Sequence, residues 1–142
     1  MEVKVSWTGP SGMGFRAETG SGHTVMMDGA PEAGGHNMAA RPMELVLAGT
    51  GGCTAFDVVL ILKRSREEVL GCDVTLQAER ADADPKVFTR INFHFTVSGK
   101  NLKPAAVERA VKLSHEKYCS ASIMLGRAGV DITHDYEIVE LG

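Results

Sequence analysis

Two of the three cysteines have sequence surroundings that favour thiol chemistry. Cys53 lies in the middle of a strongly apolar segment, and Cys119 comes immediately before Ser120, where a short helix is expected to begin. The N-terminus of a helix lowers thiol pKa values and favours the thiolate, which is the nucleophilic form. Both thiols could therefore react, although free cysteines are also among the residue types most often buried as plain packing groups.

The third cysteine and the histidines carry weaker signals. Cys72 opens a strand after Gly71 with no helix end nearby, so we expect an ordinary half-buried thiol. His115 and Cys119 have the spacing of neighbours on one helix face and could share a metal, but no third or fourth ligand is evident among the other histidines. We therefore expect neither a metal nor a cofactor.

Residues 41–64 predict the helix that positions Cys53. Pro42 suits the first turn, where its missing N–H costs nothing, and Lys63 and Arg64 suit the negative end of the helix dipole. Between these ends, apolar residues occupy nearly every side of the helix. We therefore expect it to be central and covered on most of its faces.

Three glycines and one carboxylate bear on the surroundings of this helix. Gly49, Gly51 and Gly52 each cost a helix about 1 kcal/mol relative to alanine, so we expect another backbone to approach closely beside them.

The apolar run 45–62 is about long enough to test as a membrane span. Asp57 at its middle makes a span costly, and we expect a core helix and no membrane partner.

The remaining patterns predict the elements around this helix. Strands are predicted at residues 2–7, 15–19, 23–28, 71–79, 87–98 and 130–139, and further helices at residues 104–117 and 120–126. The order βββ-α-ββ-αα-β lacks strict βαβ alternation and predicts an α+β fold with a mainly antiparallel sheet. One small sheet cannot cover a helix that is apolar on nearly all sides, so we expect a homodimer.

Composition narrows the class of protein. A chain of 142 residues with 44% hydrophobic residues predicts a single domain over residues 1–142. The net charge of −3 gives no basic surface for nucleic acid. The N-terminus lacks a charged leader before a long apolar core, so we expect a cytoplasmic protein. In that reducing compartment, a cysteine pair that forms a disulfide is usually transient and catalytic.

Several segments together resemble one protein family. They are RPMELVLAGTGGC, which ends at Cys53, EKYCS, which contains Cys119, and ITHDYEIV near the C-terminus. With the separation of the two cysteines, they are similar to the OsmC/Ohr family of thiol peroxidases and redox proteins. The segments GGCTAFDVV, FTRINFHF and LSHEKYC most resemble the YhfA-like branch of that family. The resemblance implies an intertwined α+β homodimer whose sheets wrap the central helices.

The resemblance also implies a reaction. Cys53 would be the peroxidatic thiolate, which attacks the distal oxygen of an organic hydroperoxide and is left as a sulfenic acid. Cys119 would be the resolving thiol, which condenses with that sulfenic acid to a disulfide. A dithiol such as a lipoylated protein would then reduce the disulfide. The implied role is a thiol-dependent peroxidase in the response to oxidative stress.

In the hydroperoxidase branches of the family, an arginine and a glutamate assist the peroxidatic cysteine. The resemblance points to Arg16 as the arginine, with Arg41 as a second choice, and to Glu44 as the glutamate. Met43 occupies the family's position directly after the proline, and Glu44 comes one residue later. On a straight helix this register puts Glu44 roughly opposite Cys53, because each residue turns about 100°.

Asp57 is a second departure from the hydroperoxidase pattern. It shares the helix face of Cys53, one turn away, and its carboxylate opposes thiolate formation unless a cation neutralises it. It could instead cap a local backbone group or pair with a cation across a dimer interface. These departures keep an alternative open: a non-catalytic dimeric member of the family that responds to redox state or binds a small molecule.

Overall fold

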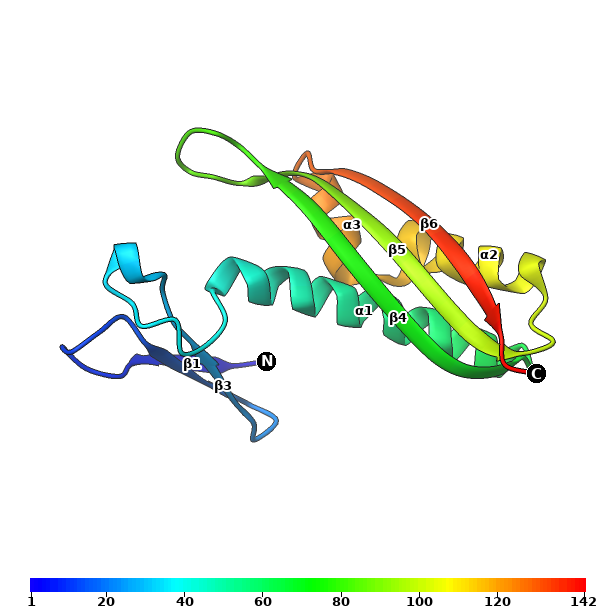
Figure 1. Ribbon diagram of the computed structural model, residues 1–142, viewed down its shortest axis with the longest axis horizontal. Helices are drawn as coiled ribbons and strands as arrows, with labels where there is room; N and C mark the ends of the chain where they lie inside the picture. The colour runs from blue at the N-terminus through cyan, green and yellow to red at the C-terminus, as the bar shows by residue number, and fades with distance from the viewer. The chain divides into compact units, whose positions relative to one another are not determined.

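A computed structural model describes all 142 residues of the chain. The chain forms two compact units, Met1–Ala48 and Gly49–Gly142, and the boundary between them falls inside helix α1 (Pro42–Arg64). Each unit contains one three-stranded sheet (Figure 1). The predicted order βββ-α-ββ-αα-β is confirmed, because every predicted strand and helix is present close to its expected position.

The first unit is built on an antiparallel meander in the order β1-β2-β3. Its strands are β1 (Val3–Trp7), β2 (Phe15–Thr19) and β3 (Thr24–Met27). Val5, Ala17 and Val25 are register partners, so their side chains share one face of the sheet. Ala17 is buried, but Val5 remains 54% exposed, and the outer part of this apolar face is therefore open in a single chain.

A buried carboxylate shapes the connection from the meander to α1, which includes a short 3-10 turn, η1 (Pro31–Ala33). Asp28 accepts backbone hydrogen bonds from Met38 at 3.0 Å, Gly29 at 2.7 Å and His36 at 3.2 Å. These bonds, that of Met38 foremost, hold the pKa of Asp28 below its usual value. The loop is thereby fixed at several points before the helix begins.

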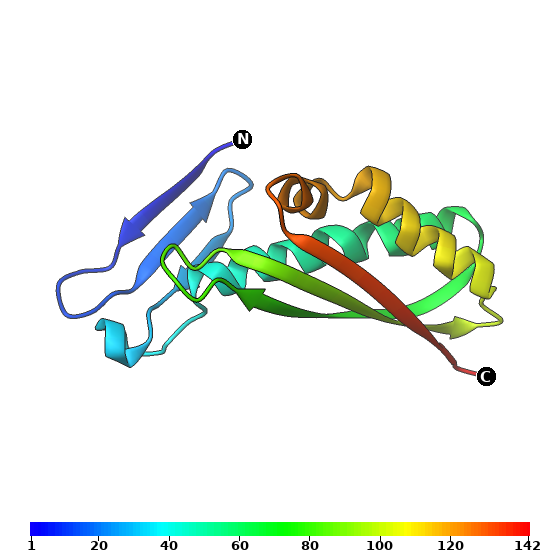
Figure 2. The same ribbon diagram turned by 90° about the horizontal axis from the view of Figure 1, so that it is seen from above.

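The second unit has the sheet order β4-β5-β6. Its strands are β4 (Glu68–Arg80), β5 (Phe88–Lys100) and β6 (Asp131–Glu140). The β4–β5 pair is antiparallel and forms the predicted long hairpin, whereas β6 is parallel to β5. Figure 2 shows α2 (Pro104–Leu113) and α3 (Ser120–Arg127) on one face of this sheet, where they carry the chain back so that β6 can run alongside β5.

The core of the second unit lies between that face of the sheet and the helices. Its fully buried side chains include Val58 and Leu62 of α1, Ile91, Phe95 and Val97 of β5, and Val107 and Val111 of α2. The apolar periodicity read from the sequence thus selects the residues that pack, since alternate positions of β5 and the i, i+4 stripe of α2 face the same interior. This core holds the thiol-bearing segments in place.

Two details of the helices differ from the sequence prediction. The predicted helix 104–117 is wrong in its last turn, because α2 ends at Leu113 and a π-helical turn, η2, follows over Ser114–Tyr118. Cys119 then adopts an extended backbone and caps α3, where Ser120 was the expected cap. Its sulfur accepts a hydrogen bond from the N–H of Ser122 at 3.4 Å, so the thiol itself satisfies a free donor at the start of the helix.

A single chain covers only one stripe of α1, in line with the expectation that its own sheet cannot cover the whole helix. Its buried residues are Thr50, Gly51, Thr54, Val58 and Leu62, which form one stripe. Phe56, on another side, is 69% exposed. Helix α1 is long and apolar enough to cross a membrane. Core helices of soluble proteins meet the same criteria of length and composition.

The glycines of α1 are only partly explained by a close approach. A Cβ added at Gly51 would lie 2.7 Å from Cδ1 of Leu76, so this position does need a small residue. The neighbour is a side chain of β4, whereas a backbone was expected. Gly49 and Gly52 face open space in the single chain.

Candidate active site

Cys53 lies half-buried on α1, facing the start of α3. Its sulfur is 3.8 Å from the hydroxyl oxygen of Ser120. The backbone N–H of Ala121 and the thiol of Cys119 also lie near this sulfur and lower its pKa. The structure therefore brings together the two cysteines that the sequence singled out, with the N-terminus of a helix directed at one of them.

These contacts decide the protonation of Cys53. Burial raises its pKa, but the hydrogen bonds from Ala121, Cys119 and Ser120 lower it by more, and the net pKa lies below the usual value for a thiol. The carboxylate of Asp57 acts in the opposite direction and raises the pKa. At a given pH, this balance makes a larger fraction of Cys53 ionised than of a free cysteine.

Cys119 is fully buried and has the opposite balance. Burial raises its pKa, and the neighbouring Cys53 raises it further, while the hydrogen bonds with Ser122 only partly compensate. Cys119 thus remains a protonated thiol that can donate to the sulfur of Cys53. The two thiols are unequal because nearby hydrogen-bond donors outweigh burial at Cys53, whereas burial outweighs them at Cys119.

A buried hydrogen-bond network holds the segment that carries Cys119. The hydroxyl oxygen of Ser114 lies 2.8 Å from that of Thr54 and donates to Oδ2 of Asp57 at 3.0 Å. The carbonyl of Ser114 accepts the N–H of Cys119 at 2.8 Å. Ser114 thus ties the π-helical turn to Thr54 and Asp57 of α1, which lie one and four residues after Cys53.

Within the chain, Asp57 caps no backbone group, and its pairing with a cation across a dimer interface stays a prediction. Its carboxylate accepts a hydrogen bond from the side chain of Ser114, and it forms no ion pair within the chain. The sequence missed this role of Ser114. The available signal was a serine on the otherwise apolar stripe of α2, a position where a polar group must find a buried partner.

The predicted assisting residues belong to the first unit and make local contacts there. Arg16 lies 3.7 Å from Glu18, and both side chains are about half exposed. Glu44 accepts the backbone N–H of Arg41 at 2.9 Å, which caps the first turn of α1. Arg41 in turn donates to the side chain of Asn37 at 2.6 Å. A role for Arg16 or Glu44 at Cys53 stays a prediction.

The remaining cysteine and histidine candidates lie apart from the thiol pair. Cys72 is half-buried in β4, and burial, with a smaller effect of Asp73, raises its pKa above the usual value. His115 stacks on His134, with ring centroids 4.9 Å apart. These surroundings give Cys72 no helix terminus or hydrogen-bond donor of the kind that activates Cys53.

Comparison with known proteins identifies the family. Residues 35–135 match the family model described as OsmC-like protein, so the chain belongs to the OsmC family. Over 139 residues it is 49% identical to Protein YhfA of Escherichia coli strain K12, and the match covers 98% of both chains. The resemblance read from the sequence, including its YhfA-like character, is confirmed.

Solved structures share the fold. A hypothetical protein from Aquifex aeolicus VF5 is 28% identical, with a TM-score of 0.84 over 99% of this chain and 97% of that one. An organic hydroperoxide resistance protein from Legionella pneumophila, described as a predicted redox protein, is 19% identical, with a TM-score of 0.67 over 96% of this chain and 97% of that one. The predicted α+β OsmC-like fold is therefore confirmed.

Proposed function

We propose that this chain reduces organic hydroperoxides with Cys53 and Cys119. The Cys53 thiolate attacks the distal peroxide oxygen, the O–O bond breaks, and the alkoxide takes up a proton and leaves as an alcohol, so that Cys53 becomes a sulfenic acid. The Cys119 thiol then displaces water from the sulfenic acid and forms a disulfide. A dithiol reduces this disulfide by exchange and is itself oxidised to a disulfide.

The observation that carries the proposal is the unequal state of the two thiols. The pKa of Cys53 is lowered, chiefly by hydrogen bonds that outweigh its burial, while burial raises the pKa of Cys119. A peroxidatic nucleophile requires a lowered pKa. A raised pKa keeps the resolving thiol protonated, so that it does not react with peroxide itself. Membership of the OsmC family and the hydroperoxide resistance proteins that share the fold support the same reading.

A second function is favoured by one observation. Asp57 raises the pKa of Cys53 and has no cationic partner within the chain. In this alternative the protein is a non-catalytic dimer whose cysteine pair responds to redox state without turning over peroxide. The two functions differ in rate, because only a peroxidase attacks peroxide faster than an ordinary thiol does.

The proposal includes a homodimer in the cytoplasm. Apolar side chains are exposed on both units, among them Val5 and Trp7 on β1 and Phe56 on α1. A soluble chain rarely leaves so many apolar groups open unless a partner covers them. A second copy is the simplest partner, and a cytoplasmic location would supply the dithiol reductant.

Turnover assays test the proposed reaction. Wild type and Cys72→Ser should consume cumene and tert-butyl hydroperoxide with dithiothreitol or dihydrolipoamide as reductant, and Cys53→Ser should not. Organic peroxides should be preferred over hydrogen peroxide, because each methylene buried in an apolar site contributes about 0.8 kcal/mol. Wild-type turnover no faster than that of free cysteine would favour the non-catalytic alternative.

A further inference from the structure

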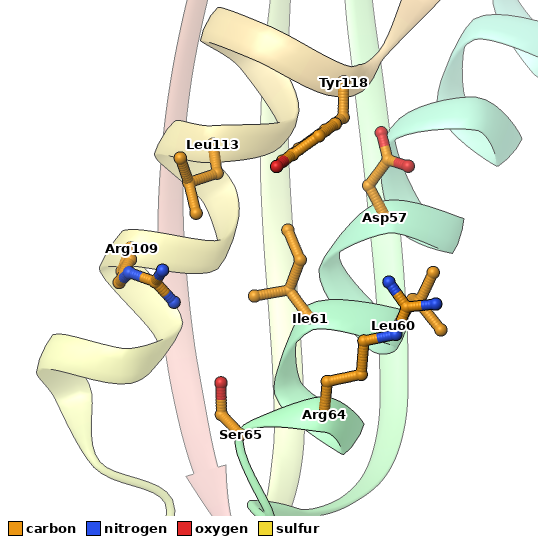
Figure 3. Close-up of a pocket in the computed structure, with 8 residues that line it drawn as sticks. All are labelled: Asp57, Leu60, Ile61, Arg64, Ser65, Arg109, Leu113 and Tyr118. Atoms are coloured by element: carbon orange, nitrogen blue, oxygen red, sulfur yellow. The ribbon is translucent and has the colours of Figure 1, made fainter.

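A cavity of about 360 Å³ lies between α1 and α2 in the second unit. This volume falls within the roughly 300 to 1,000 Å³ typical of small-molecule sites. Leu60 and Ile61 of α1 and Leu113 of α2 supply apolar side chains to its lining. Figure 3 shows Ile61 reaching from α1 toward the side of Leu113 and α2, with Leu60 beside Arg64 and with Asp57 and Tyr118 together at one end.

Two arginines, one from each helix, give this cavity its charge. Arg64 comes from α1 and Arg109 from α2, and Figure 3 shows them on opposite sides of Ile61. Neither guanidinium forms an ion pair within the chain. Both guanidinium groups line the cavity and are therefore available to a bound anion.

The single carboxylate that lines the cavity does not neutralise the arginines. Asp57 is held by the hydroxyl of Ser114 at 3.0 Å, at the end of the cavity formed with Tyr118. An anionic group is therefore repelled from that end and attracted to the guanidinium groups of Arg64 and Arg109. The apolar side chains between the two ends can cover a hydrocarbon body.

We propose that this cavity binds a small organic anion, with its acidic group on the guanidinium of Arg109 or of Arg64 and its apolar body against Ile61 and Leu113. Guanidinium groups suit carboxylate and phosphate oxygens because they can donate two parallel hydrogen bonds. The inference is independent of peroxide reduction. It follows from the cavity and its unpaired charges, and its test reads binding alone.

Calorimetric titration of the full chain tests this site with octanoate, octyl phosphate, 1-octanol and octyltrimethylammonium as probes. At least one of the two anions should bind once per chain, at least about tenfold more tightly than the alcohol, because charge-assisted hydrogen bonds to arginine are lost without the acidic group. Preference between octanoate and octyl phosphate then identifies the acidic group. The cationic probe should not bind.

Paired variants separate the site from general charge effects. Arg64→Gln with Arg109→Gln should weaken anion binding at least about tenfold, through the same lost hydrogen bonds. Lys86→Gln with Arg127→Gln removes two exposed positive charges outside the cavity and should leave the affinity unchanged. Equal binding of alcohol and anions, equal loss in both double variants, or no anion binding by wild type would each overturn the proposal.

Discussion

The pKa of Cys53 depends on a few hydrogen bonds, and this predicts a pH dependence for each thiol. The pKa of Cys53 lies below the usual thiol value, so its thiolate should persist to lower pH than that of free cysteine. The pKa values of Cys72 and Cys119 are raised, so these thiols should react only at higher pH. Iodoacetamide labelling across pH, read by mass spectrometry, should show Cys53 modified first as pH rises.

The carboxylate of Asp57 offers a test of this balance. Because its charge raises the pKa of Cys53, Asp57→Asn should lower that pKa and extend Cys53 labelling to lower pH. Asp73→Asn is the matched control, since Asp73 raises the pKa of Cys72 and should change the labelling of Cys72 alone. A Cys53 profile that is unchanged in Asp57→Asn, or shifted by Asp73→Asn, would contradict this account.

The sequence singles out the two candidate thiols better than it predicts their protonation. Cys53 and Cys119 stand in motifs that can be read directly. The N–H of Ala121 and the hydroxyl of Ser114 act across segments that are distant in sequence, and no local pattern reports such a contact. Local sequence patterns could therefore predict which thiols meet, but only the family resemblance indicated which of them has the lowered pKa.

In the proposed reaction, the π-helical turn Ser114–Tyr118 positions Cys119 to resolve the sulfenic acid. Ser114→Ala removes the buried partner of Thr54 and Asp57, which should lower the free energy of unfolding by about 1 to 3 kcal/mol. It should also loosen the segment that carries Cys119. Attack on peroxide should then remain fast while disulfide formation slows, so that more Cys53 is over-oxidised.

Two measurements check this prediction. Urea unfolding gives the change in stability, and mass spectrometry after peroxide treatment gives the ratio of disulfide to sulfinic acid. Ser11→Ala is a suitable control, because Ser11 is exposed and its side chain has no hydrogen bond in the structure. If Ser114→Ala forms the disulfide as completely as wild type does, the network does not position Cys119.

The end of α2 at Leu113 could not be predicted from the sequence. The apolar stripe of α2 predicts a helix, and Val107 and Val111 are buried as that stripe requires. The same stripe continues to Ser114, and it does not indicate that the α-helix gives way to a π-helical turn there. Ser114 contacts Thr54 and Asp57 of α1 at this point, and such tertiary contacts cannot be read from a local period.

At the scale of the whole molecule, the exposed side of α1 predicts a homodimer. Gly52, Phe56 and Val59 line an open groove of about 420 Å³ on this side. Phe56→Glu should convert the dimer to monomer or to aggregates, because a carboxylate buried in an apolar interface is costly. Val87→Glu, at an exposed apolar residue of the β4–β5 loop, should remain dimeric. Sedimentation at micromolar concentration distinguishes these states, and a folded, soluble wild-type monomer would contradict the prediction.

The fold class could be predicted from the order of elements, whereas the covering of α1 could not. Apolar residues on nearly all sides of a helix indicate how much of its surface must be buried. They do not show what covers it, and a single chain covers only the stripe that includes Val58 and Leu62. The sequence therefore predicts a partner without identifying the surfaces that meet.

Stopped-flow oxidation of cysteine variants tests the division of roles between Cys53 and Cys119 most directly. With one equivalent of cumene hydroperoxide, Cys119→Ser should react once in a fast phase and keep a sulfenic acid on Cys53, because no thiol remains to condense with it. Cys53→Ser should lose the fast phase, since a hydroxyl cannot replace a thiolate nucleophile. Wild type should end with a disulfide between Cys53 and Cys119 and a reduced Cys72. A fast phase retained in Cys53→Ser, or a wild-type phase no faster than that of free cysteine, would contradict the account.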